Sequence, residues 1–85
     1  MRKKLNKPRK PEWMEDGQLH HVFNGPYRSA SDEWGCVVWL TANIHAEIHN
    51  NAEARREMKA IWQKRLEAAG WTREEFRETF GKSYL

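Results

Sequence analysis

The sequence has few of the cysteines that most often cross-link and stabilise a small protein. Among its 85 residues there is a single cysteine, Cys36. No disulfide can therefore form within the chain, and no cysteine-rich zinc ribbon can be built. Such low cysteine usage fits a reducing, intracellular setting.

Long apolar stretches are missing as well. No segment approaches the roughly 20 apolar residues of a membrane span, and no apolar run of signal-peptide length follows the basic N-terminus. We therefore expect a soluble, cytoplasmic protein without a membrane partner. A chain of this length makes at most one small domain, which buries only roughly 60% of its unfolded surface, so a bound metal could add stability.

Positive charge is concentrated near the N-terminus. Residues 1–12 have a net charge of +5, whereas the whole chain has +3. The basic residues of this stretch are Arg2, Lys3, Lys4, Lys7, Arg9 and Lys10. With two prolines and almost nothing apolar, the stretch predicts a disordered arm. It could be a solubilising tail, but we favour a nucleic-acid-binding arm, because clustered Lys and Arg release counterions from phosphates.

Residues 13–85 are expected to form a single domain that begins with two antiparallel strands. The first strand is expected near residues 19–23, and Gly25-Pro26 marks a turn after it. Residues 36–40 are β-branched and aromatic enough to be the returning strand. The loop between the strands contains Ser29-x-x-Asp32, whose capping-box spacing predicts a single helical turn.

Helices are expected over residues 41–49, 52–69 and 72–80. Thr41 is a plausible N-cap, Gly70 a natural stop, and Thr72-x-x-Glu75 a capping box. Ile44 and Ile48 lie four residues apart and would face an apolar neighbour. The middle helix would pack through Ala54, Met58, Ile61, Trp62, Leu66 and Ala69.

All four histidines lie in two short pieces of the chain. On a helix, the imidazoles of His45 and His49 would share one face, one turn apart, where both can bind one metal ion. His20 and His21 are neighbours on a strand, so their side chains point to opposite faces. Only one of these two can readily join the same ion, which leaves the other for a different task.

The sequence Thr41-Ala42-Asn43-Ile44-His45-Ala46-Glu47-Ile48-His49, preceded by a His-His strand, resembles the His-Me finger or HNH endonucleases. Their core is a ββα-metal motif, and the nuclease domains of bacterial colicins have the form T-x-x-x-H-x-[DE]-I-H. Residues 20–40 and 80–85 also look like small HNH-type proteins of bacteriophages. The resemblance covers residues 18–49 well and implies a nuclease encoded by a phage or prophage.

The resemblance implies that His20, His45 and His49 bind one divalent metal ion and that His21 is the general base. Phosphodiester hydrolysis needs a water deprotonated near neutral pH, a task that suits histidine. An all-imidazole site favours zinc, nickel or copper, while the family implies that several ions are accepted. We expect zinc as the bound ion, with nickel, manganese or magnesium as alternatives.

Two residues depart from the family pattern. Cys36 stands where the central asparagine helps to orient the base, and Gln18 stands where colicin nucleases have an acidic residue. A backbone carbonyl at Cys36 could still serve, and Gln18 can donate and accept hydrogen bonds. Both residues are therefore candidates for orienting the base, although Cys36 also suits a small core position.

Further basic and aromatic residues have two interpretations each. Arg28 in the loop, and Arg55 and Arg56 after the metal helix, are candidates for phosphate contacts, yet exposed arginines are more often simply solvated. In so small a domain a tryptophan either packs in the core or stacks on bases, and we favour packing in the core. The tryptophans concerned are Trp34, Trp39, Trp62 and Trp71.

The sequence thus predicts an α+β fold with a ββα-metal core at residues 18–50, a basic arm and two C-terminal helices. The predicted function is metal-dependent endonucleolytic hydrolysis of DNA, with double-stranded DNA as the expected partner. The alternative is a non-catalytic, metal-stabilised nucleic-acid-binding or phage-assembly module with a phage protein as its partner. His21 discriminates between them, because a structural metal site has no use for a fourth imidazole.

Overall fold

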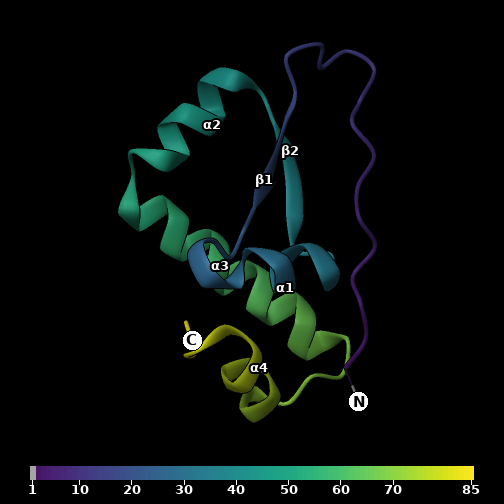
Figure 1. Ribbon diagram of the computed structural model, residues 1–85, viewed down its shortest axis with the longest axis vertical. Helices are drawn as coiled ribbons and strands as arrows, with labels where there is room; N and C mark the ends of the chain where they lie inside the picture. Colours follow the sequence, from purple (N-terminus) through teal and green to yellow (C-terminus); the bar gives the residue numbers. More distant parts are fainter. Residues whose placement is uncertain (1) are drawn as a thin grey trace.

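The computed structural model describes residues 2–85, which form an α+β fold with one small sheet and four α-helices (Figure 1). Strands β1 (Gln18–His21) and β2 (Val37–Leu40) pair antiparallel, with His20 opposite Val38 and His21 opposite Val37. The remaining elements are the 3-10 helix η1 (Gly25–Tyr27) and the helices α1 (Arg28–Glu33), α2 (Ala42–His49), α3 (Ala52–Ala68) and α4 (Arg73–Phe80). The predicted fold class is confirmed at this level.

Local capping signals place the helix starts close to their predicted positions. The Thr41 hydroxyl accepts a hydrogen bond from the Ile44 amide at the start of α2. At the start of α4, Thr72 and Glu75 form the complete capping box that their spacing predicted. These short-range bonds fix where α2 begins and therefore which residues of α2 face the sheet.

The predicted capping role of Ser29 and Asp32 is wrong. Helix α1 follows Tyr27, which makes no side-chain capping bond. Ser31 is the buried residue of this helix, and its hydroxyl accepts from the Phe23 amide at 3.1 Å and donates to the Cys36 carbonyl at 2.6 Å. The loop is therefore tied to both strands, which leaves the Asp32 carboxylate free to reach other partners.

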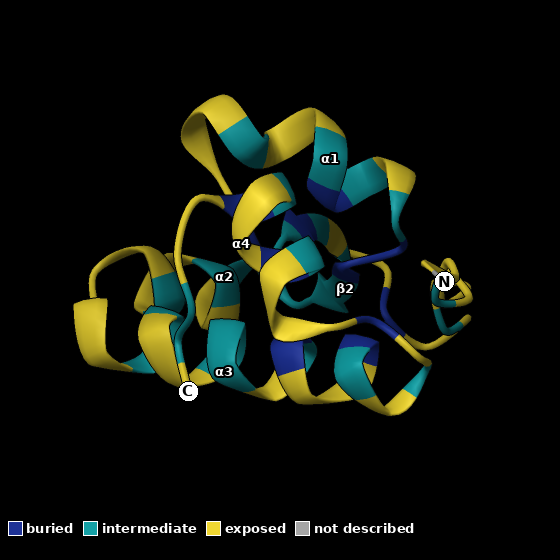
Figure 2. Ribbon diagram, turned by 90° about the horizontal axis from the view of Figure 1, so that it is seen from below, coloured by how far each residue is buried: buried dark blue, intermediate teal, exposed yellow. Residues whose placement is uncertain are grey.

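The core lies between the hairpin, α3 and α4, where aromatic rings pack on one another. Phe23 stacks on Phe80 with ring centroids 4.1 Å apart and meets Phe76 edge-on at 5.5 Å. Leu66 of α3 is fully buried, whereas Ile61, which was predicted to share its face, is 52% exposed. Figure 2 shows buried segments of α3 and α4 turned toward the interior. No helix within residues 2–85 is long and apolar enough to cross a membrane.

The basic N-terminal segment differs from the disordered arm that the sequence predicted. It runs extended beside the hairpin (Figure 1), and the Leu5 amide donates to the Trp34 carbonyl at 3.0 Å. The indole N–H groups of Trp71 and Trp39 donate to the backbone carbonyls of Lys3 and Pro8, both at 2.9 Å. Hydrogen bonds from the indole N–H groups of two tryptophans thus hold in place a segment that has little apolar surface of its own.

Removing residues 2–10 should lower the free energy of unfolding by about 1–3 kcal/mol, because the buried indole N–H of Trp71 loses its acceptor. Urea unfolding of the truncated and full-length proteins measures this difference. Lys3→Gln is the matched control, since it removes charge but keeps the backbone carbonyl. Equal unfolding midpoints for the truncated and full-length proteins would show that the segment does not stabilise the fold.

Candidate metal centre

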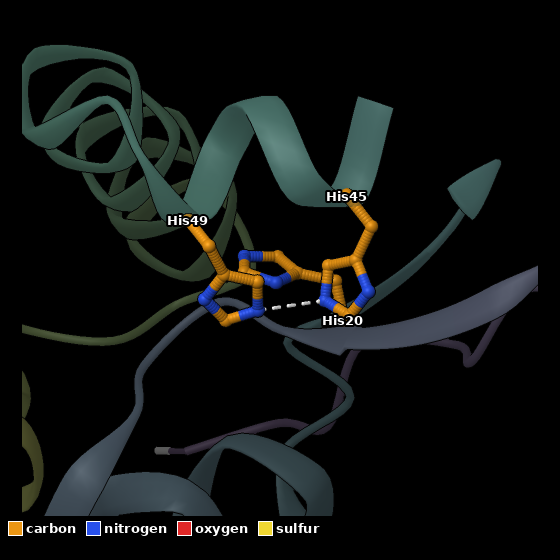
Figure 3. A group of neighbouring side chains, drawn as sticks. All are labelled: His20, His45 and His49. Atoms are coloured by element: carbon orange, nitrogen blue, oxygen red, sulfur yellow. Dashed lines mark hydrogen bonds between the residues drawn. The ribbon is translucent and has the colours of Figure 1, made fainter. Parts of the chain in front are cut away.

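Three of the four histidines converge between β1 and α2. His45 and His49 lie one turn apart on α2 and point at His20 of β1, as Figure 3 shows. One ring nitrogen from each of the three residues lies within 4.8 Å of the others. Among residues 2–85 this is the one group of three or more His, Cys, Asp or Glu side chains that lie close enough together to hold a metal ion. The structure therefore brings together the three residues that were predicted as ligands.

The geometry of the three imidazoles suits a divalent ion bound by nitrogen. In a tetrahedral zinc site with bonds of 2.0–2.1 Å, the ligand nitrogens are about 3.4 Å apart. The Nε2 atoms of His45 and His49 are already 3.0 Å apart, and the His20 ring meets both rings edge-on. Small side-chain rotations would suffice to place all three nitrogens around one ion. Three protein ligands also leave a fourth position for water or substrate.

Gln18 orients one of these candidate ligands. Its Oε1 atom lies 2.5 Å from Nδ1 of His45, so that nitrogen carries the hydrogen and donates it. The Nε2 lone pair of His45 is then available to the ion, as in metal sites where a neighbouring group fixes the imidazole tautomer. Gln18 thus contacts His45, a candidate ligand, whereas the sequence suggested a role in orienting the base.

His20 is the buried member of the group, with 4% of its surface exposed. Burial lowers its pKa to about 4, assisted by the positive charges that His45, His49, His21 and Lys59 can carry. The ring is therefore neutral at physiological pH, the state in which imidazole binds metal. An uncharged, buried imidazole at the floor of the group is well suited to be the first ligand.

Without metal, the protein should become less stable as the pH falls from 6.5 toward 4. Unfolded His20 takes up a proton near pH 6.5 but the folded residue only near pH 4, so the unfolded state binds more protons in this window. The difference amounts to about 3 kcal/mol, present above pH 6.5 and lost by pH 4. Urea unfolding with a chelator measures it. A His20→Ala variant with the same pH dependence would contradict this assignment.

His21 stands apart from the three candidate ligands. Its Nε2 atom lies 3.3 Å from the Asp32 carboxylate of α1, and its side chain is 15% exposed. The alternation of side chains along β1 thus separates the two adjacent histidines, as the strand geometry predicted. Asp32 also pairs with Lys7 at 2.9 Å, and this hydrogen bond is the main reason that the carboxyl has a lowered pKa. Asp32 is therefore a carboxylate at neutral pH.

All four histidines line one cleft of about 290 Å³, together with Arg28 and the Asn24-Gly25 turn. His21 and Arg28 also line the adjoining hollow that contains Asp32. Arg28 is exposed at this boundary, so its charge can reach a ligand in either space. The predicted phosphate contact of Arg28 stays a prediction, and the structure places this residue where the contact would be useful.

The other predicted site residues have different surroundings. Cys36 is fully buried, burial raises its pKa to about 12, and its carbonyl accepts from Ser31 and from the Val22 amide. Among the described residues, no hydrogen bond joins Cys36 to His21, the base that it was suggested to orient. Arg55 donates to the carbonyls of Ile48 and His49 and thus caps the C-terminus of α2.

The remaining basic candidates lie on the surface. Arg56 is exposed, as are Lys3, Lys4, Arg9 and Lys10 of the N-terminal segment. Arg2 lies over the rings of Trp34 and Trp71, and Lys7 pairs with Asp32. Sequence reasoning missed the contact between Asp32 and His21, because the spacing of Asp32 from Ser29 suggested a helix cap.

Comparisons of the chain with models of known protein families, with curated proteins and with solved structures found no match. The geometry of the four histidines and their neighbours is therefore the basis for any functional assignment.

Proposed function

We propose that this protein is a metal-dependent endonuclease of DNA, with a ββα-metal core formed by β1, β2 and α2. The observation that carries the proposal is the division among the four histidines of one cleft. Three imidazoles converge on a common point, and the fourth is held beside them by a carboxylate. The resemblance of residues 18–49 to HNH endonucleases supports the same assignment.

In the proposed reaction, His21 acts as the general base. Asp32 accepts a hydrogen bond from Nε2–H of His21, which leaves the Nδ1 lone pair free to take a proton from an attacking water. The carboxylate also stabilises the imidazolium that results, as in other pairs of histidine and aspartate. The Lys7 ammonium shares this carboxylate and keeps it ionised. The base is thus oriented by α1 and the N-terminal segment together.

His20, His45 and His49 would hold a divalent ion, with zinc the expected occupant of an all-imidazole site. When bound, the ion supplies Lewis-acid stabilisation of the charge that develops on phosphate oxygens. Arg28, at the mouth of the same cleft, would pair with a phosphate and orient the strand. The buried floor formed by His20 keeps the ligand group in place while the mouth admits substrate.

Incubation of the protein with supercoiled plasmid tests the proposal. We expect nicked and then linear DNA in the presence of Zn²⁺, Ni²⁺, Mn²⁺ or Mg²⁺, and intact plasmid with excess chelator. His45→Ala, purified in the same way, is the control for contaminating nucleases. Plasmid that stays intact with every ion would contradict the nuclease assignment. DNA binding together with metal binding would then favour the non-catalytic, metal-stabilised module.

A further inference from the structure

Two lysines from distant parts of the chain meet at one aromatic ring. Lys59 lies on α3 and Lys82 follows α4, and their ammonium nitrogens are 5.4 and 5.3 Å from the centroid of the Tyr84 ring. Each is within the range of a cation–π contact. The fold therefore brings two positive charges to the same half-buried ring.

Neither charge is neutralised by a carboxylate. Within residues 2–85, the ion pairs closer than 4.0 Å involve neither Lys59 nor Lys82. Burial lowers the pKa of Lys59, and the positive charges of Arg55 and Lys82 lower it further. Like charges that are held together destabilise one another, so an anion bound between them would be stabilised by both.

Lys59 lines a second cleft that adjoins the metal centre, and Lys82 lies over the ring of Tyr84, another residue of the cleft lining. This cleft of about 220 Å³ is lined by Lys59, Tyr27 and Tyr84, and it shares the Asn24-Gly25 turn with the histidine cleft. Gly25 has no side chain, and open space surrounds the position that a Cβ would take. A ligand could thus extend over the turn from one cleft into the other.

We propose that this second cleft binds a phosphate of the DNA strand that flanks the scissile phosphate, with Lys59 and Lys82 as its partners. The inference rests on the proposed nuclease function. It adds that the DNA strand runs from the metal centre over the Asn24-Gly25 turn toward Lys59 and Lys82. Phosphate is the matching occupant because it presents several acceptor oxygens to two unpaired ammonium groups. The rings of Tyr27 and Tyr84 form the wall on which the sugar or base of that nucleotide rests.

DNA binding by the variant Lys59→Gln/Lys82→Gln tests the proposal. Fluorescence anisotropy with a labelled oligonucleotide gives Kd, and the zinc-loaded His21→Ala background prevents cleavage during the titration. We expect binding at least tenfold weaker, with a salt slope reduced by about 0.7–0.9 for the lost phosphate. The control Lys64→Gln/Arg77→Gln removes the same charge from exposed positions. Lys64 lies about 140° around α3 from Lys59.

A small substrate separates this inference from the nuclease proposal. Bis(p-nitrophenyl) phosphate is too short to reach the second cleft, so the double variant with His21 intact should hydrolyse it at the wild-type rate. A loss of this activity, binding equal to that of the control variant, or no DNA binding by the wild-type chain would each overturn the inference. If the wild-type chain hydrolyses no phosphodiester, the nuclease proposal fails, while the binding comparison still decides whether the two lysines hold phosphate.

Discussion

Replacing His21 with alanine should lower the rate of DNA cleavage by about 10²- to 10⁴-fold, the range typical of a lost general base. The three imidazoles proposed to bind the metal are untouched by this change, because His21 lies outside their group and contacts Asp32 instead. Metal content, melting temperature and DNA affinity should therefore stay near their wild-type values. Single-turnover cleavage of a labelled duplex measures the rate without interference from product release.

Asn24→Ala is a matched control for this comparison. Asn24 lines the same cleft but caps η1 without a side-chain hydrogen bond, so its loss should leave the rate within a few-fold of wild type. A His21→Ala enzyme that cleaves as fast as the wild type would eliminate His21 as the base. Loss of metal from the same variant would mean that the two strand histidines exchange roles.

Replacing His20 with alanine should abolish metal binding, metal-induced stabilisation and cleavage together. His20 contributes the buried imidazole of the group, so only the imidazoles of His45 and His49 would remain. A ligand exclusive to the folded state stabilises it by about 4 kcal/mol at a thousandfold excess over Kd. Differential scanning calorimetry should show a large zinc-dependent rise in Tm for the wild type and little or none for the variant.

The His21→Ala variant serves as the control in calorimetry, since it removes the adjacent imidazole from the same strand and should keep the full rise in Tm. A His20→Ala protein that zinc stabilises as strongly as it stabilises the wild type would refute the three-histidine site. Replacing His20 should therefore remove the zinc-dependent rise in Tm, whereas replacing His21 should keep that rise and lower the cleavage rate.

The parts of the fold that depend on neighbours in the sequence could be predicted. The spacing of His45 and His49 placed both rings on one face of α2, and the capping residues Thr41 and Thr72 marked helix starts correctly. The alternation of side chains in a strand predicted that His20 and His21 face different surroundings. In each case the relevant interaction spans four residues or fewer, so the local pattern contains the information.

The contacts that were missed connect residues far apart in the chain. The bond from Trp71 to Lys3 spans 68 residues, and nothing near Lys3 indicates that its carbonyl has a buried donor to satisfy. Asp32 lies 11 residues from His21, and Gln18 lies 27 residues from His45. Such pairs depend on how the loop and α2 fold back over the hairpin, which composition and spacing do not determine.

The X-ray absorption spectrum of the zinc-loaded protein at the zinc edge tests the three-histidine centre most directly. The proposed site predicts one ion per chain, bound by three imidazole nitrogens and one oxygen ligand, with no sulfur because Cys36 is buried in the core. His45→Ala should reduce the imidazole count or abolish binding. A spectrum with fewer than three imidazoles, or with a sulfur ligand, would contradict the site on which the proposed function depends.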